Sequence, residues 1–408
     1  MKMLASISWR NIWRHPARSG VLVGAVIIGI WAGLVISAWT NGVIEQRINK
    51  VIQEELTHLQ IHHPDFLTER EPELIITSVD EIFSFLQGDP RVQNFTARTI
   101  ADGMIQSSLT TSGVQISGVL PEREVRTTEF HKNLVEGTYP DADTRNPVLI
   151  GKNLAEKLNV VTGNRIVLSF QDINNELTSG AFNITGIFRT GQSSYDERKV
   201  LVHSRDLSNL IAGKPVYHEI AVMLNDAEQS DELAAELNQR YKNIEAETWI
   251  ELSPEMRYMT GTGESYMFYI MVVIILALAF GILNTMLMAI FERMRELGML
   301  MAIGMSKSRV FLMIMLESVF ITATGAAGGI LLGYFSVSYL SEHGLDLTSV
   351  GGDTLAQWGY DPLVYPSITP EEYITVSILI ILTAILAAVY PAIKALRLKP
   401  GEVVREKL

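Results

Sequence analysis

The chain has 408 residues, a formal net charge of −12 at pH 7 and no cysteine. Without cysteine it has no disulfide bonds, so each of its domains must be stabilised by its own core. The basic residues do not gather in a soluble patch, so the sequence gives no reason to expect a nucleic-acid partner.

Four apolar segments are each long enough to cross a hydrocarbon core of roughly 30 Å, which takes about 20 helical residues. They are residues 21–39, 266–291, 310–340 and 373–393, and the only charge among them is Glu317. The first segment follows basic residues and could be a cleaved signal peptide. We expect an uncleaved anchor, because its apolar run exceeds the roughly 7–15 residues of such peptides and no small-x-small site follows.

The connecting segments separate into two groups by charge. Residues 1–19 carry four basic residues and no acidic one, and basic residues also outnumber acidic ones at 292–308 and 394–408. Residues 41–265 carry 34 acidic and 20 basic residues, and residues 341–372 carry six acidic residues and no basic one. The positive-inside rule then predicts that both termini and residues 292–308 are cytoplasmic and that the two acidic segments lie outside.

These patterns predict an α-helical membrane protein with four transmembrane helices and a large α+β extracytoplasmic domain between helices 1 and 2. Residues 1–18 read as a cytoplasmic interfacial helix, because Arg10, Arg14 and Arg18 share one stripe beside Trp9 and Trp13. The predicted segments are the interfacial helix 1–18, the transmembrane helices 19–40, 266–291, 309–340 and 373–393, the outer domain 41–265, the cytoplasmic elbow 292–308, the second outer loop 341–372 and the cytoplasmic tail 394–408.

The outer domain alternates short apolar strands with short helices. Leu59 and Ile61 alternate with polar residues, as in a strand with one solvated face that would carry His58 and His62. We expect strands near residues 59–61, 113–119, 148–150, 165–170, 182–188, 200–202 and 219–224, and helices near 80–87, 153–158, 204–211 and 228–243.

The sequence shows little catalytic chemistry. It contains no G-x-x-x-x-G-K-[ST] loop, so we expect that this chain does not hydrolyse ATP by itself. His218 and Glu219 begin a zincin-like motif, but no second histidine follows at the required spacing. His58, His62 and His63 offer ligand types without a convincing site. We therefore expect no enzyme, no cofactor and no metal.

The elbow at 292–308 carries charges at both ends of an apolar stretch. A short helix of this kind can seat in a groove of a cytoplasmic partner, with turns at Gly298 and Gly304. The alternative is a plain re-entry loop that obeys the positive-inside rule, although that rule does not explain Glu292 and Glu296. The residues expected to couple to a partner are Glu292, Arg293, Arg295, Glu296, Leu297, Gly298, Ala302, Ile303, Gly304 and Ser306.

The third span holds two further features. Gly325, Gly329 and Gly333 recur every four residues, which lets helices approach closely, either within one subunit or at a dimer seam. Glu317 lies inside the span, where an ionisable residue is functional or is paired for packing. Asn284 of the second span is the hydrogen-bond partner that we expect for it.

The elbow sequence ERMRELGMLMAIGMS at 292–306 resembles the signature of FtsX/MacB-type permeases, the membrane subunits of type VII ABC transporters. Glu317 matches an acidic residue of that family, and YPAIKALRLKP at 390–400 is similar to its C-terminal ending. WRNIWR at 9–14 is similar to the opening of many such permeases, and further family patterns are resembled by ISGVLPERE at 116–124, PVLIGKNLA at 147–155 and GIFRTG at 186–191. Together these segments point to a resemblance to the LolC/LolE-type lipoprotein-releasing branch.

The resemblance implies a permease that works by mechanotransmission in a bacterial inner membrane. It implies a cytoplasmic LolD-like ABC ATPase on the elbow, a second permease subunit in a homo- or heterodimer, and membrane lipids around the spans. It also implies a lipoprotein or other hydrophobic cargo and a possible periplasmic carrier. The alternatives are a MacB-like efflux permease for peptides or drugs, an FtsX-like regulator of a cell-wall hydrolase, and a sensor beside a kinase.

Overall fold

The computed structural model describes residues 6, 8–10, 14, 16–140, 144–190, 192–349 and 360–396, without the side chains of residues 18, 254–256 and 259–267. The chain forms two compact units. The helical unit comprises Met1–Ile44, Gly261–Asp346 and Leu363–Leu408, and the α+β unit comprises Glu45–Thr260 and Leu347–Pro362. Most of the predicted interfacial helix 1–18 and of the tail 394–408 lies outside the described residues.

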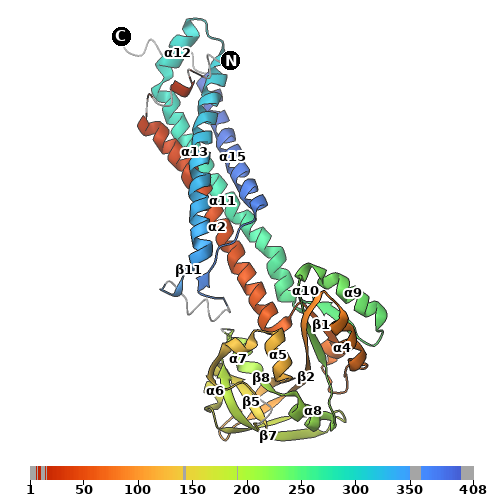
Figure 1. The fold of residues 1–408 in the computed structure, drawn as a ribbon. Helices are drawn as coiled ribbons and strands as arrows, with labels where there is room; N and C mark the ends of the chain where they lie inside the picture. The colour runs from red at the N-terminus through yellow and green to blue at the C-terminus, as the bar shows by residue number, and fades with distance from the viewer. Residues whose placement is uncertain are drawn as a thin grey trace. The chain divides into compact units, whose positions relative to one another are not determined.

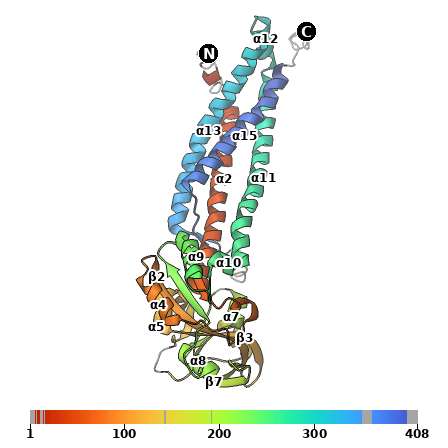
Figure 2. The same ribbon diagram turned by 90° about the vertical axis from the view of Figure 1, so that its right-hand side faces the viewer.

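Where the chain is described, the helical unit contains four long helices. They run side by side in two perpendicular views, with the short helix α12 (Met294–Ala302) at one end (Figures 1 and 2). Each contains a stretch long and apolar enough to cross a membrane, and together they are α2 (Pro16–Val51), α11 (Pro254–Glu292), α13 (Lys307–His343) and α15 (Pro370–Leu396). The prediction of four transmembrane helices and an α+β domain between the first two is confirmed.

The glycine stripe of α13 packs against α2 of the same chain. A Cβ added at Gly325, Gly329 or Gly333 would lie 2.7, 2.8 or 2.6 Å from side-chain atoms of α2. Only residues without a side chain allow this approach. Of the two alternatives for these glycines, packing within one subunit is therefore the one observed.

Hydrogen bonds join the segment of residues 341–372 to α2. The Ser367 N–H donates to the Ala38 carbonyl at 2.9 Å, and the Asn41 amide donates to both carboxylate oxygens of Glu372 at 2.9 and 3.0 Å. The same loop contains a short hairpin of β11 (Leu345–Asp346) and β12 (Leu363–Val364). Residues 350–359 of this loop lie outside the described residues.

The described residues of the α+β unit include ten strands that form one continuous sheet. β2 pairs with β3, β3 with β8, β8 with β5, β5 with β7, β7 with β6 and β6 with β2, so these six strands close into a barrel. Large apolar side chains, including Phe170 and Phe182, fill its interior. The strands are β1 (Leu59–His62), β2 (Val92–Gln106), β3 (Thr111–Val119), β4 (Leu134–Gly137), β5 (Pro147–Gly151), β6 (Arg165–Gln171), β7 (Leu177–Phe188), β8 (Lys199–His203), β9 (Glu219–Leu224) and β10 (Glu245–Thr248).

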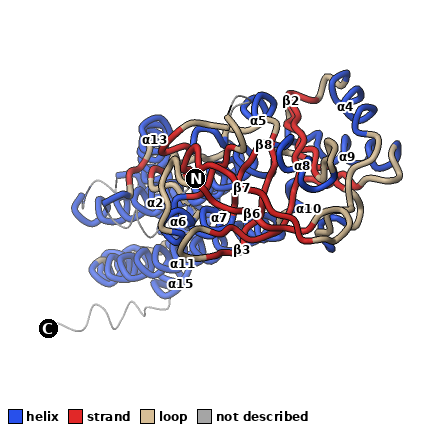
Figure 3. The backbone as a smooth tube through the Cα atoms, turned by 90° about the horizontal axis from the view of Figure 1, so that it is seen from below, coloured by secondary structure: helices blue, strands red, loops and turns tan. Residues whose placement is uncertain are grey.

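The long strand β2 belongs to two layers. Its first half pairs with β9 and continues the antiparallel sheet β10–β1–β9, whereas its second half pairs with β3 and β6 of the barrel. Helices α4 and α9 cover the first sheet through apolar contacts (Figures 1 and 3). The helices of this unit are α3 (Phe66–Glu69), α4 (Val79–Gly88), α5 (Pro121–Thr127), α6 (Lys152–Leu158), α7 (Ser193–Arg198), α8 (Ser204–Ala212), α9 (Ser230–Arg240) and α10 (Trp249–Leu252), with the π-helical turn η1 (Ile52–Leu56) and the 3₁₀ turns η2 (Phe130–Asn133) and η3 (Ala227–Gln229).

The strands and helices predicted within residues 41–265 are all present, but the strands β2, β4 and β10 and the helices α3, α5, α7 and α10 were not predicted. The expectation of a solvated face on β1 is wrong. His62 is fully buried and stacks on Phe66, because β1 lies between β9 and β10 with apolar helices over it. His58 instead accepts a hydrogen bond from the Leu224 N–H at 3.1 Å.

Candidate functional site

The first turn of the elbow is made at Arg293. Glu292 is the last residue of α11, and Arg293 precedes α12 with φ −99° and ψ 14°. Its carbonyl accepts from the Leu297 N–H at 3.0 Å, which starts the new helix. Gly298 lies inside α12, so the expectation of a turn at this glycine is wrong.

The second turn is made at Gly304, as the sequence predicts. Its φ of +106° lies in the region that favours glycine, and its N–H donates to the Met301 carbonyl at 3.1 Å. Ser306 then adopts an extended conformation at the N-terminus of α13, and its carbonyl accepts from the Arg309 N–H at 2.9 Å. The elbow is thus a nine-residue helix between two defined turns.

An ion pair joins the first turn to α13. Arg293 Nη1 lies 3.0 Å from each carboxylate oxygen of Glu317, and Arg293 Nε lies 3.2 Å from Glu296. The side chains of Arg293 and Glu317 are each only 16% exposed. Glu317 follows Lys307 by ten residues, so the pair reaches about 15 Å along α13.

The expected hydrogen bond between Asn284 and Glu317 is wrong. Asn284 is exposed on α11, and the Glu317 carboxylate is occupied by Arg293 instead. An arginine just outside the span compensates the buried carboxylate better than an amide, because it brings a full positive charge.

The predicted site residues divide into two sets by the direction in which they face. Leu297 and Gly298 are buried, and Leu297 belongs to the same apolar cluster as Val310 and Met313 of α13, while Arg293 is bonded to Glu317. The others are exposed, namely Glu292, Arg295, Glu296, Ala302, Ile303, Gly304 and Ser306. The first set holds the elbow to the bundle, and only the second is available to a partner.

The exposed face of α12 includes a residue that the sequence prediction missed. Met299 is 59% exposed and Ile303 is 79% exposed, four residues apart on one stripe with Arg295 and Ala302. Apolar residues so exposed outside the spans are typical of a protein-binding surface. The spacing 295, 299, 302 and 303 could have revealed Met299 in the sequence.

Other candidate residues do not form a second site. Among the residues that the structure describes, no three His, Asp or Glu side chains are grouped to hold a metal ion. Of the N-terminal segment, Ser8 donates to the Met313 carbonyl at 3.1 Å and Trp9 packs edge-on against Phe320. These described residues therefore lie against α13 near the elbow.

Two family models match the chain. The MacB-like periplasmic core domain matches residues 19–240, and the FtsX-like permease C-terminal domain matches residues 268–400. The crystal structure of the periplasmic region of MacB from Actinobacillus actinomycetemcomitans covers 54% of this chain and 98% of that chain, with 12% sequence identity and a TM-score of 0.37.

Curated relatives include two lipoprotein-releasing system transmembrane proteins LolC. The protein of Neisseria meningitidis serogroup B is 23% identical over 54% of this chain and 56% of its own length. The protein of Xylella fastidiosa is 20% identical over 78% of each chain. Since the first family model alone covers more than half of the chain and the second covers most of the remainder, the chain belongs to the FtsX/MacB-type family of ABC transporter permeases.

Proposed function

We propose that this permease transmits ATP-driven movement of a cytoplasmic ATPase, bound at α12, to the α+β unit on the outer side of an inner membrane. The observation that carries the proposal is the exposed stripe of α12, backed by buried contacts with α13. Met299 and Ile303 offer an apolar contact, and Arg295 and Glu296 flank it with charges. A partner that pushes on this stripe also moves α11 and α13, because Arg293 joins the turn to Glu317.

The charge bias supports the orientation. With both termini and residues 292–308 in the cytoplasm, residues 41–265 and 341–372 face the periplasm. In the helical unit, the start of α2, the end of α11, the start of α13 and the end of α15 all lie at the α12 end, as this orientation requires (Figure 1). ATP is hydrolysed by the partner in this scheme, and two permease subunits, identical or different, complete the transporter.

We further propose that the cargo is a lipoprotein released from the inner membrane. LolC relatives at 20–23% identity support this substrate class. The face of α11 toward the bilayer carries Tyr269, Val273, Leu276 and Phe280, each at least 51% exposed and spaced along one stripe. In this scheme the acyl chains of the cargo pack on this face, which is as apolar as the lipid tails that they leave. Beside it, a Cβ at Gly29 of α2 would lie 3.1 Å from Leu278, so the two helices meet at a glycine.

The test is reconstitution in liposomes with the cognate ATPase and a lipid-modified protein. ATP-dependent transfer of that protein to a soluble carrier supports lipoprotein release. Export of a peptide without lipoprotein release favours a MacB-like efflux permease, and activation of a cell-wall hydrolase without either favours an FtsX-like regulator.

The ATPase contact is tested on the same system. Ile303→Asp should abolish co-purification of the ATPase, because it places a charge in the apolar stripe. Ser308→Asp is the matched control, since Ser308 is also exposed but lies outside the stripe. Undiminished ATPase binding in the Ile303 variant would refute α12 as the docking surface.

A further inference from the structure

The chain enters the α+β unit through the end of one long helix. α2 ends at Val51 and continues as the π-helical turn η1, which closes with a hydrogen bond from the Thr57 N–H to the Ile52 carbonyl at 2.8 Å. Thr57 is buried and has φ 56° and ψ −174°, a positive-φ conformation that strains a β-branched residue. Its hydroxyl donates to the Leu59 carbonyl at 3.0 Å. The surroundings therefore hold this helix end in one conformation.

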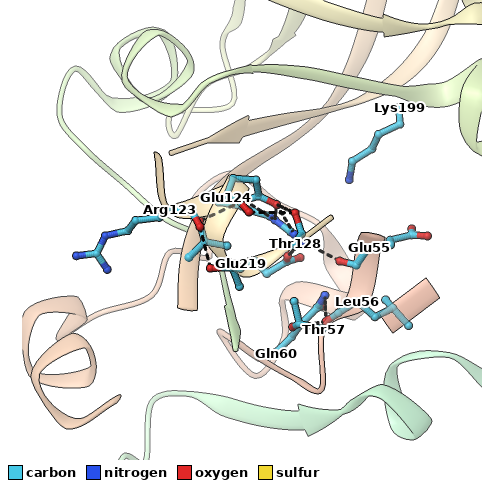
Figure 4. Close-up of polar contacts among 12 residues, drawn as sticks. Glu55, Leu56, Thr57, Gln60, Arg123, Glu124, Thr128, Lys199 and Glu219 are labelled. Carbon is cyan, nitrogen blue, oxygen red and sulfur yellow. Dashed lines mark hydrogen bonds and ion pairs between the residues drawn. The ribbon is translucent and has the colours of Figure 1, made fainter. Parts of the chain in front are cut away.

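A buried arginine, Arg98, donates a hydrogen bond to a backbone carbonyl at the C-terminal end of η1. Arg98 lies in the middle of β2 and is 6% exposed. Its Nη1 donates to the Glu55 carbonyl at 2.9 Å and to Glu219 of β9 at 2.6 Å, and its Nη2 donates to Glu124 of α5 at 2.6 Å. Figure 4 shows Glu55, Glu124 and Glu219 around this point. One guanidinium thus joins η1 to three elements of the α+β unit.

Two further donors hold neighbouring carbonyls of the same turn. The last four carbonyls of a helix lack partners within it. Here the Gln53 carbonyl accepts from the Glu129 N–H at 2.8 Å, and the Leu56 carbonyl accepts from the Gln60 amide at 2.9 Å. With the Glu55 carbonyl, three of the last four are bonded to residues beyond the helix. The positive guanidinium also complements the negative end of the helix dipole.

The carboxylates of Glu124 and Glu219 stabilise the charge of Arg98 and fix its position. Glu124 is 2% and Glu219 is 7% exposed, and Glu124 also accepts from the hydroxyls of Thr96 and Thr128 at 3.2 and 3.3 Å. Burial opposes the ionisation of Glu219, but Arg98, together with smaller contributions from His62 and Lys199, outweighs burial and holds the pKa of Glu219 well below its ordinary value. Both acids therefore face a cation that is itself fixed on the sheet.

We propose that Arg98 is the positioning residue that makes η1 and the α+β unit one rigid body, so that a movement of α2 reaches the sheet undiminished. This role presupposes the proposed function. All contacts of the joint lie within Glu45–Thr260, so it is a property of the α+β unit alone. A helix end held only by its chain would instead bend at Thr57, and the movement would be lost there.

The test uses the full-length protein with its ATPase in nanodiscs. Removing Arg98 alone leaves two buried carboxylates uncompensated, so the main variant combines Arg98→Gln, Glu124→Gln and Glu219→Gln. A second variant, Arg98→Lys, keeps a charge between the acids but does not span both of them and the Glu55 carbonyl at once.

The matched control is a second arginine, Arg91, which directly precedes the same strand. Arg91 pairs with Asp89 and Glu236 at 2.6 Å each, without a bond to η1. The control variant therefore combines Arg91→Gln, Asp89→Asn and Glu236→Gln, which makes the same chemical changes.

Spin labels report the joint directly. The chain has no cysteine, so cysteines introduced at the exposed positions Gln53 and Arg126 carry the only labels. The wild type and the control should give one narrow distance distribution that nucleotide does not change. The Arg98 variants should broaden it, and cargo release per ATP should fall about 3- to 30-fold while ATP turnover is retained.

An unchanged distance distribution in both Arg98 variants would overturn the proposal, and so would equal broadening in the Arg91 control. Retained release per ATP despite broadening would also overturn it. The label distances and ATP turnover do not depend on cargo. If the wild type releases no lipid-modified protein, the proposed cargo fails while the distances still decide whether Arg98 holds the joint.

Discussion

The ion pair between Arg293 and Glu317 gives a quantitative test of how the elbow is held. Glu317→Gln, Arg293→Gln and the double variant form a thermodynamic cycle. Both carboxylate oxygens lie 3.0 Å from one guanidinium nitrogen, and each side chain is 16% exposed. Hydrogen bonds between charged groups contribute about 1.5–3 kcal/mol, so we expect an interaction energy in that range. This corresponds to about a 10- to 150-fold change in the equilibrium that holds the elbow on α13.

The assay is reversible unfolding in mixed micelles, together with cargo release per ATP in liposomes. Each single variant should lose free energy of unfolding, and the double variant should lose less than the sum. Arg295→Gln is the control, because Arg295 is exposed on α12 and should change stability by less than about 0.5 kcal/mol. An interaction energy below about 0.5 kcal/mol would refute the idea that this pair fastens the elbow. Cargo release per ATP should fall when the ion pair is removed. The change in the free energy of unfolding does not depend on the identity of the cargo.

Three further predictions test individual features of the fold. Gly329→Ala should destabilise the helical unit by about 1–3 kcal/mol, because its Cβ would lie 2.8 Å from a side-chain atom of α2, whereas Gly24→Ala, with nothing within 4 Å, should be neutral or slightly stabilising in detergent unfolding. Gly304→Ala should cost about 1–2 kcal/mol at its φ of +106°, whereas Gly298→Ala inside α12 should cost nothing in the same assay. Burial lowers the pKa of His218, so the folded protein favours the neutral imidazole. The stability that His218 contributes should be complete above about pH 6.5 and should fall as the pH drops below that value. In chemical denaturation between about pH 7 and 5, His218→Gln should make the free energy of unfolding less dependent on pH.

The spans were predictable because an apolar run of about 20 residues is rare outside a helix that crosses a membrane. The strand β2 was not, although it is the longest strand and the centre of the α+β unit. Residues 96–101 of β2 are all buried, yet Thr96, Arg98 and Thr99 are polar, so the sequence shows no alternation of apolar and polar residues. Their partners Glu124, Ser204 and Glu219 lie 26, 105 and 121 residues away, and no local pattern announces such pairs.

The elbow shows the same limit on a smaller scale. Its position and its glycine turn at Gly304 follow from local sequence, since a positive φ is a local requirement. The spacing groups Arg295, Met299, Ala302 and Ile303 on one face, but local sequence does not show that this face points outward, because that depends on how α12 packs against α13. The partner of Glu317 was also beyond local reasoning. The sequence places an acid in a span but does not say that the chain turns back at Arg293 to meet it.

The turn at Arg293 and the buried partner of η1 both lie at helix ends, and the physics of helices explains why the ends matter most for transmission. A helix shaft is stiff because each residue is bonded four residues along, but its terminal groups have no partner within the helix. Whether a helix movement is transmitted to the next element therefore depends on how the end of the helix is bonded. In this chain Arg293 directly follows α11 and is bonded to Glu317, and the Glu55 carbonyl near the end of η1 is bonded to Arg98. Each arginine is held in turn by carboxylates from other elements, so each end is tied to the structure around it. A force that passes along these helices is therefore transmitted to the neighbouring elements through Arg293 and Arg98.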